Sequence, residues 1–147
     1  MFTRIVVGTD GSETASEAVS RAIELAKLAG AQLSIVSAYE PVPKRRIEAE
    51  QHDAPPDVQY ELNPREDVNL VLDAAAATAK KDGVEVQTHP VEANPADAIL
   101  EVAEKTDADL IVVGNKGMTG ARRYLLGSVP NNVSHHAPCS VMVVRTT

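Results

Sequence analysis

The residues best suited to chemistry form a glycine-rich segment that runs from Gly114 to Ser128. After Gly114 come two residues, Gly117, nine more residues and the pair Gly127-Ser128. Glycines lack a Cβ, so backbone amides near them can approach phosphate oxygens closely, and positive φ angles are accessible. The Gly127-Ser128 pair stands just before an expected helix, whose free amides and dipole favour an anion. This spacing predicts a polyphosphate cradle built from backbone groups.

Two better-known phosphate-binding motifs do not fit this segment. A P-loop has four residues between its glycines and then lysine with serine or threonine, and the dinucleotide fingerprint has glycines at intervals of one and two residues. Neither pattern is present in the glycine-rich segment. The formal net charge of -7 and the pI of about 5.0 argue against a nucleic-acid surface, which neutralises phosphates with lysine and arginine. An anionic ligand must therefore be held locally.

A second polar turn, Thr9-Asp10-Gly11, follows the apolar stretch from Ile5 to Gly8, just as the glycine-rich segment follows Leu110 to Val113. These two stretches are the best candidates for adjacent central strands. In open parallel sheets, ligands bind beyond the carboxyl ends of the strands, where the strand order reverses. The two turns are therefore expected to converge on one site, although an aspartate such as Asp10 is in general more often a turn or capping residue.

The chain around these turns alternates between strand and helix patterns. Strands are expected at 3–9, 33–38, 84–91, 109–113 and 140–144, with the third at an edge. Helices are expected after Ser12, Asn63-Pro64 and Asn94-Pro95 and over 129–136, and the first has an apolar stripe that includes Ala26 and Leu28. This order predicts a single α/β domain over 1–147, with an open, mainly parallel five-stranded sheet and helices on both faces.

Other polar or reactive residues are best explained without a functional role. Arg122 and Arg123 fit a solvated turn, and His135 and His136 fit a helix C-terminus. Cys139 has no partner for a disulfide and is expected to be buried and inert. The sequence shows no metal-ligand spacing, nucleophile elbow, secretion signal or membrane span, so a cytoplasmic protein without membrane contact is expected. The long loop from Glu40 to Leu62 is either functional or a tolerated insertion.

Over its whole length the chain resembles the universal stress protein family. The resemblance rests on the stretch from Val7 to Ser12, the stretch from Ala108 to Gly114, the glycine spacing described above, and Ala137-Pro138-Cys139-Ser140-Val141. In that family the glycine spacing distinguishes members that bind ATP. The resemblance implies the adenine nucleotide alpha hydrolase-like fold, a Rossmann-like sheet, and a homodimer formed through the last strand, Val141 to Val144.

The resemblance also implies a set of nucleotide-binding positions. Asp10 corresponds to an acidic residue near the ribose and phosphates, acting through Mg²⁺ if a metal accompanies the nucleotide, and the backbone of Ala38 to a contact with the adenine edge. The full set is Thr9, Asp10, Ala38, Gly114, Gly117, Gly127, Ser128 and Val129. The last three correspond to the cradle of the terminal phosphates. One departure from the family follows them, because Pro130-Asn131-Asn132 stands where other residues are usual and could alter the fit of the terminal phosphate.

The implied function is that of a stress-response regulator in which ATP occupancy acts as a switch. No catalytic residue is identified, because no general base accompanies the cradle. One alternative is a preference for AMP or cyclic AMP, which would use the cradle only in part. Another is slow ATP hydrolysis or autophosphorylation, with Asp10 holding a metal and Thr9 or Ser128 accepting phosphate.

Overall fold

A computed structural model describes residues 1–40, 64–115 and 128–146 of the chain. Within these ranges strands and helices alternate as expected. The elements are β1 (Arg4–Gly8), α1 (Glu13–Ala29), β2 (Gln32–Tyr39), α3 (Pro64–Lys81), β3 (Val86–Glu92), α4 (Pro95–Lys105), β4 (Leu110–Gly114), α5 (Ser128–His136) and β5 (Ser140–Val144). All the neighbouring strands pair in parallel, which confirms the α/β fold class.

The strand order is β3-β2-β1-β4-β5, so the chain reverses its direction across the sheet once. It steps outward from β1 to β2 and β3, crosses back over the sheet, and continues with β4 and β5. Strands β1 and β4 are therefore adjacent, with Val6 paired to Ile111 and Val7 to Val112. Their carboxyl ends form the switch point where ligands bind in open sheets of this kind. The edge position expected for β3 is confirmed.

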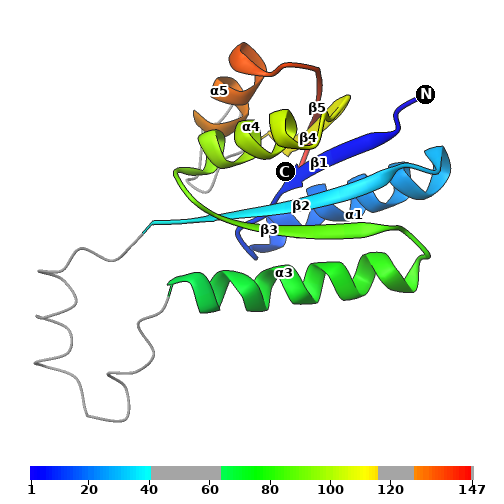
Figure 1. Ribbon diagram of the computed structural model, residues 1–147, viewed down its shortest axis with the longest axis horizontal. Helices are drawn as coiled ribbons and strands as arrows, with labels where there is room; N and C mark the ends of the chain where they lie inside the picture. The colour runs from blue at the N-terminus through cyan, green and yellow to red at the C-terminus, as the bar shows by residue number, and fades with distance from the viewer. Residues whose placement is uncertain (41–63, 116–127, 147) are drawn as a thin grey trace, which may run out of the picture.

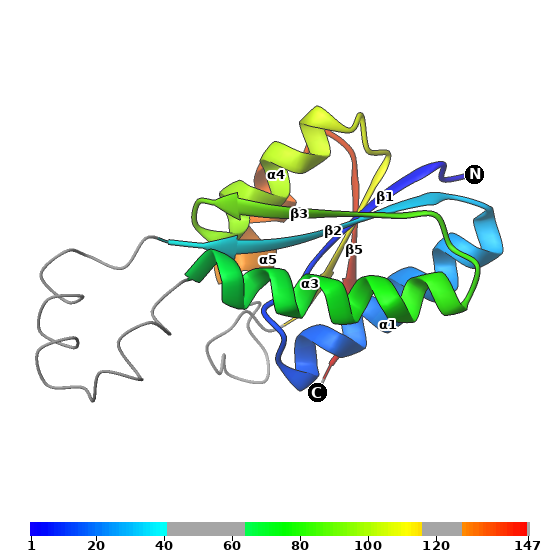
Figure 2. The same cartoon turned by 60° about the horizontal axis from the view of Figure 1, so that its bottom comes forward.

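Helices cover both faces of the sheet, with α1 and α3 on one side and α4 on the other (Figures 1 and 2). Successive residues of a strand point to opposite faces, so the strands supply two cores. Val7 lies in the core under α1 and α3. Val6 lies in the core under α4, and that core also contains Val133 of α5. The central strands are buried on both sides, and this explains their nearly continuous aliphatic sequences.

The expected helix ends are present where the structure describes them. The Ser12 hydroxyl caps α1 by accepting a hydrogen bond from the amide of Ala15, and Gly30 ends the helix with φ 66°. Asn94 caps α4, and Pro95 is its first residue. Pro64 begins α3 as expected, while its predicted cap, Asn63, lies outside the described residues.

One position in the predicted apolar stripe of α1 was wrong. Leu28 is 85% exposed, whereas Ala26 is buried at 1%. Two residues advance a helix by about 200°, which carries Leu28 to the face opposite Ala26. The fully buried part of the stripe therefore ends at Ala26, and Ala29, which is partly buried, continues it against the core.

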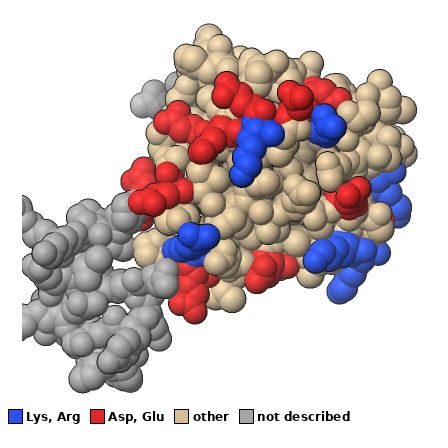
Figure 3. Space-filling model, in the orientation of Figure 1, with Lys and Arg blue, Asp and Glu red and all other residues tan. Residues whose placement is uncertain are grey.

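Acidic side chains are spread over much of the face drawn in Figure 3, and basic side chains are scattered among them. The described part of this face has no large basic patch of the kind that binds nucleic acid. None of the helices in the described ranges is long and apolar enough to cross a membrane.

Candidate functional site

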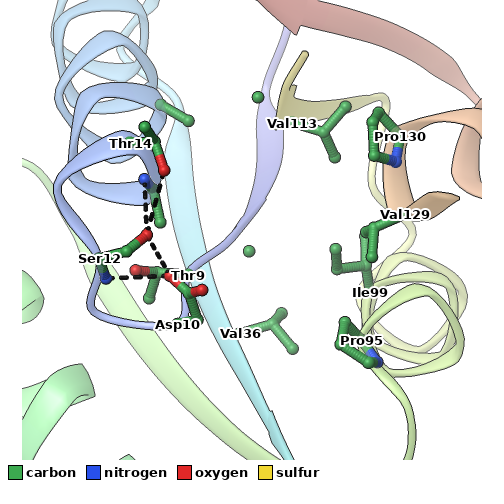
Figure 4. A pocket seen from close by; sticks show the side chains of 14 residues that line it. Thr9, Asp10, Ser12, Thr14, Val36, Pro95, Ile99, Val113, Val129 and Pro130 are labelled. Atoms are coloured by element: carbon green, nitrogen blue, oxygen red, sulfur yellow. Dashed lines mark hydrogen bonds between the residues drawn. The ribbon is translucent and has the colours of Figure 1, made fainter. Parts of the chain in front are cut away.

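A cavity opens at the carboxyl ends of β1 and β4, where the sequence predicts that two polar turns converge. Its volume is about 70 Å³, and the empty space between its walls comes to about 580 Å³ when the part open to solvent is included. The turn from β1 to α1, strands β2 and β4, and the first turns of α4 and α5 surround it (Figure 4). The described lining residues are Gly8, Thr9, Asp10, Ser12, Thr14, Ala15, Ala18, Val36, Pro95, Ile99, Val113, Gly114, Val129 and Pro130.

One wall of the cavity is polar and comes from the turn between β1 and α1. The amide of Thr9 donates to the carbonyl of Val36 at 2.9 Å, which fixes the start of the turn to β2. The Thr9 hydroxyl accepts a hydrogen bond from the amide of Gly11 at 3.1 Å. Thr9 is only 8% exposed. Its two hydrogen bonds set the path of the turn beside the cavity.

Asp10 has a structural role in this turn and also faces the cavity. Its Oδ1 accepts hydrogen bonds from the amide of Ser12 at 2.9 Å and from the Ser12 hydroxyl at 2.6 Å (Figure 4). This is the local geometry expected of a turn aspartate. Asp10 is nevertheless part of the lining, and it is the one charged side chain among the described lining residues. The structural and the ligand-facing interpretations are therefore compatible.

Two glycines allow helices to approach this turn closely. A Cβ on Gly8 would lie 2.7 Å from Cδ1 of Ile99, so the glycine lets α4 pack against the end of β1. Gly11 has φ 83°, a left-handed conformation that favours glycine, and a Cβ there would lie 2.9 Å from Cγ2 of Val71 in α3. The stretch Gly8-Thr9-Asp10-Gly11 is thus approached by α4 at its first residue and by α3 at its last.

The opposite wall is apolar. Side chains from β2, α4, β4 and the start of α5 face the polar turn across the cavity in Figure 4; they are Val36, Pro95, Ile99, Val113, Val129 and Pro130. Ligand sites usually combine such a surface with a few polar groups that fix orientation. This cavity can therefore receive a flat, largely apolar ring on one side and polar substituents on the other.

Helix α5 begins at the rim of the cavity. Ser128 is its first residue and is exposed, Val129 is half-buried, and Pro130 is buried. The first amides of a helix have no partner within the helix and favour an anion. Pro130 carries no N–H, so it interrupts this series of amides. The start of α5 is therefore a weaker anion site than a helix without proline would provide.

The structure brings together four of the residues predicted from the sequence, since Thr9, Asp10, Gly114 and Val129 all line the cavity. Ser128 directly precedes Val129. Gly117 and Gly127 lie outside the described residues, so their predicted roles stay predictions.

Ala38 lies on β2, two residues beyond the lining residue Val36. Its described neighbours are Val91, its partner in the sheet, and the core on the α4 side. Its side chain is not part of the described lining. The contact predicted for its backbone with an adenine edge stays a prediction.

Sequence reasoning missed the contribution of α4, which supplies Pro95 and Ile99, and that of Val36 on β2. The spacing of the two α4 residues indicates that they share a helix face, because Pro95 begins the helix and Ile99 lies one turn later. The missing information was which strand ends α4 covers. That depends on the crossover from β3 back to β4 and hence on the strand order.

Titratable groups elsewhere in the described chain do not contribute to this cavity. Burial lowers the pKa of His89 on β3, and the charge of Lys105 adds to the effect. Burial raises the pKa of the Cys139 thiol, with a smaller contribution from Asp109, and a raised thiol pKa is the direction expected of an unreactive thiol. Cys139 is half-buried, so the prediction that it is buried was wrong. Within the described ranges no three side chains of His, Cys, Asp or Glu are grouped so that they could hold a metal ion.

Comparisons with known proteins identify the family of the chain. The model of the universal stress protein family matches residues 1–145. Universal stress protein Rv1636 of Mycobacterium tuberculosis is 38% identical over 147 residues, covering 99% of this chain and 98% of the relative. Universal stress protein MJ0531 of Methanocaldococcus jannaschii is 37% identical over 148 residues, covering 99% of this chain and 83% of the relative.

Two solved structures similar to this chain contain nucleotides. A universal stress protein in complex with cAMP is 34% identical with a TM-score of 0.73, and the match covers 99% of this chain and 98% of that one. The universal stress protein of Archaeoglobus fulgidus in complex with dAMP is 25% identical with a TM-score of 0.67, covering 96% of each chain. From the family match and the near full-length relatives together, the chain belongs to the universal stress protein family.

Proposed function

We propose that this chain binds an adenine nucleotide in the cavity at the carboxyl ends of β1 and β4. The observation that carries the proposal is the pairing of an apolar wall with a hydroxyl- and carboxylate-bearing turn at the switch point of the sheet. The complexes of two relatives with cAMP and dAMP support the same ligand class.

The two walls suggest how the ligand is placed. The adenine ring packs against the apolar wall near Val36 and Ile99, with the backbone of Ala38 at its edge. The ribose lies toward Thr9 and Asp10, and the phosphates extend toward the glycine-rich segment. In that segment Gly114 and Gly117 contact the ribose and first phosphate, and Gly127, Ser128 and Val129 hold any terminal phosphate. Mg²⁺ would join Asp10 to phosphate oxygens.

The protein acts in this proposal as a regulator rather than an enzyme. ATP, AMP and cyclic AMP are the candidate ligands. Nucleotide binding in the cavity changes how the protein binds its partners in a stress response. Slow ATP hydrolysis is the competing function. Phosphate release that stops in Asp10→Ala would support hydrolysis, whereas release at the rate of the buffer alone would exclude it.

Isothermal titration calorimetry tests the binding proposal directly. We expect saturable binding of at least one adenine nucleotide at or below millimolar concentration, and weaker binding of the matching guanine nucleotide. The guanine comparison controls for non-specific binding of phosphate. No saturable heat with ATP, with or without Mg²⁺, with AMP or with cyclic AMP would refute the proposal.

The predicted homodimer is part of the same proposal. Strand β5 forms one edge of the sheet, and its Met142 and Val143 side chains are each 39% exposed. An exposed apolar edge strand is a natural surface for pairing with a second copy. Gel filtration with light scattering would report a dimer if this edge pairs, and a monomer at all concentrations if it does not.

A further inference from the structure

A groove runs between α1 and α3, which lie side by side on one face of the sheet (Figure 2). Its volume is about 440 Å³, within the range of small-molecule sites. Its walls are a stripe of α1 between Ser16 and Ile23 and a stripe of α3 between Leu70 and Thr78. Thr9 is the one residue that its described lining shares with that of the nucleotide cavity proposed above, so the two are separate spaces.

The groove is open because short side chains line its two walls. Ser16 and Ser20 lie one turn apart on α1, and α3 contributes Ala74 and Ala75. The distance between packed helices depends on the side chains at their contact, and longer side chains at these four positions would fill the gap. The space is therefore a property of the sequences of both helices.

The inner surface of the groove is apolar. Val19 and Ile23 of α1 are only 6% and 2% exposed, and both belong to the core under α1 and α3. Val71 of α3 is half-buried, and Leu70 at the margin of the groove is 66% exposed. A ligand with an apolar surface would remove part of these side chains from water, which favours binding.

The described lining of the groove contains no ionisable side chain, although the chain carries a formal charge of -7. On α1, Arg21 pairs with Glu17 at 3.5 Å and with Glu24 at 3.1 Å, and none of these three residues lines the groove. A charged group that leaves water without a partner of opposite charge pays a large desolvation cost. The groove therefore favours an uncharged ligand.

Hydroxyl groups supply the polar part of the lining. They belong to Thr9, Ser16, Ser20 and Thr78. A hydroxyl both donates and accepts hydrogen bonds, so it serves uncharged amines, alcohols and carbonyls equally well. The Thr78 hydroxyl donates to the carbonyl of Ala74 at 3.3 Å and keeps its own oxygen as an acceptor.

We propose that the groove between α1 and α3 is a second ligand site, which takes an uncharged, largely apolar ring compound with one or a few hydrogen-bonding groups. The apolar inner surface packs against the ring, and the hydroxyls orient its polar groups. The lined part of each helix is only about two turns long, or about 10–12 Å. This length suits a small molecule and is short for a stable interface with another protein.

Fluorescence titration of the full chain with N-phenylnaphthylamine tests the proposal. This uncharged aromatic amine becomes brighter in apolar surroundings, and anilinonaphthalene sulfonate is its matched control, since it has the same rings and a sulfonate group. The amine should bind saturably, with an affinity at least about tenfold above that of the sulfonate. No saturable binding of the amine would overturn the site, and equal affinities would overturn its preference for uncharged ligands.

Two variants fill the groove from opposite walls. Ala74→Phe and Ser20→Phe change exposed residues of its lining, and each should weaken binding of the amine at least about tenfold through loss of space. Ala77→Phe is the matched control, because Ala77 is an exposed alanine of the same helix outside the described lining. It should leave the affinity within about twofold. Unchanged affinity in both groove variants, or an equal loss in Ala77→Phe, would overturn the location of the site.

Competition with cyclic AMP separates the groove from the nucleotide cavity, which has an apolar wall of its own. Binding of the amine should persist when cyclic AMP is saturating. Complete displacement that is equally strong in Ala74→Phe would place the amine in the nucleotide cavity and overturn the proposal. A dimer that Ala74→Phe dissociates and Ala77→Phe does not would assign the groove to a second copy instead. The nucleotide proposal is tested separately, by calorimetry with the nucleotides themselves.

Discussion

Two aspartates flank the same pair of central strands at opposite ends, and they have different surroundings. Asp109 directly precedes β4 at the amino ends of the strands. Its Oδ2 accepts from the amide and hydroxyl of Thr3 at 2.8 and 3.0 Å, and its Oδ1 accepts from the amide of Arg4 at 3.0 Å. Asp10 follows β1 at the carboxyl ends, where Oδ1 alone is engaged among the described hydrogen bonds, by Ser12.

The difference shows that one residue type ties strands together at one end of the sheet and lies beside a cavity at the other. At the amino end, the chain itself supplies donors to both oxygens of Asp109 and ties β1 to β4. At the carboxyl end, the β1–α1 turn holds one oxygen of Asp10 and leaves the carboxylate beside a cavity.

The largest effect is expected from Gly114→Val at the carboxyl end. The branched side chain would enter the cavity that Gly114 lines, so the nucleotide affinity should fall more than about 100-fold through loss of ligand space. The control is Gly30→Ala near the amino end, where φ is 66° and nothing lies within 4 Å of an added Cβ. It should cost about 1 kcal/mol of unfolding free energy and leave the affinity unchanged. Calorimetric titration measures the nucleotide affinity, and thermal unfolding measures the stability. Equal affinities in the two variants would contradict the location of the site.

Asp10→Asn should have an intermediate effect on the ATP affinity, and the direction of that effect depends on whether Mg²⁺ is present. Removing the carboxylate charge from the cavity should strengthen metal-free ATP binding about tenfold, because repulsion between like charges is relieved. With Mg²⁺ present the gain should disappear, since the carboxylate would then bind the ion. The matched control, Asp109→Asn, should not change either affinity. If Asp10→Asn leaves metal-free binding unaltered, Asp10 does not face the phosphates.

Asp109→Asn should have the smallest effect, on stability alone. Partial burial raises the pKa of Asp109, but the hydrogen bonds from Thr3 and Arg4 outweigh it and hold the pKa below its ordinary value. A depressed carboxyl pKa stabilises the fold above the unfolded pKa, and this contribution is lost as the pH falls through the folded value. The variant should therefore be about 1 kcal/mol less stable at neutral pH. Denaturant unfolding should show the difference vanishing in acid, and a difference that persists there would point to a cause other than charge.

Much of the fold follows from local sequence. Ser12, Gly30 and Asn94-Pro95 have types that fix helix ends, and the structure uses them in that way. The aliphatic runs around Val7 and Val112 indicated two central strands, and their pairing is confirmed. Helix ends depend on a few neighbouring residues, and buried strands have continuous aliphatic sequences. Both patterns can be recognised in the sequence.

The cavity was predictable on its polar side and less so on its apolar side. Thr9, Asp10 and Gly114 lie at strand ends, where the general rule for open sheets places ligands. Ile99 and Val36 line the cavity because α4 crosses over β1 and β2, which depends on the strand order rather than on local pattern. Their aliphatic side chains look like ordinary core residues in sequence, so nothing local marks them as ligand contacts.

A crystal structure of the chain grown with saturating cyclic AMP would decide whether the nucleotide occupies this cavity. We expect the adenine against Val36 and Ile99, with the cyclic phosphate near Thr9, Asp10 and Gly114. Nucleotide bound only elsewhere on the surface, or this cavity occupied by the protein's own side chains despite saturation, would contradict it.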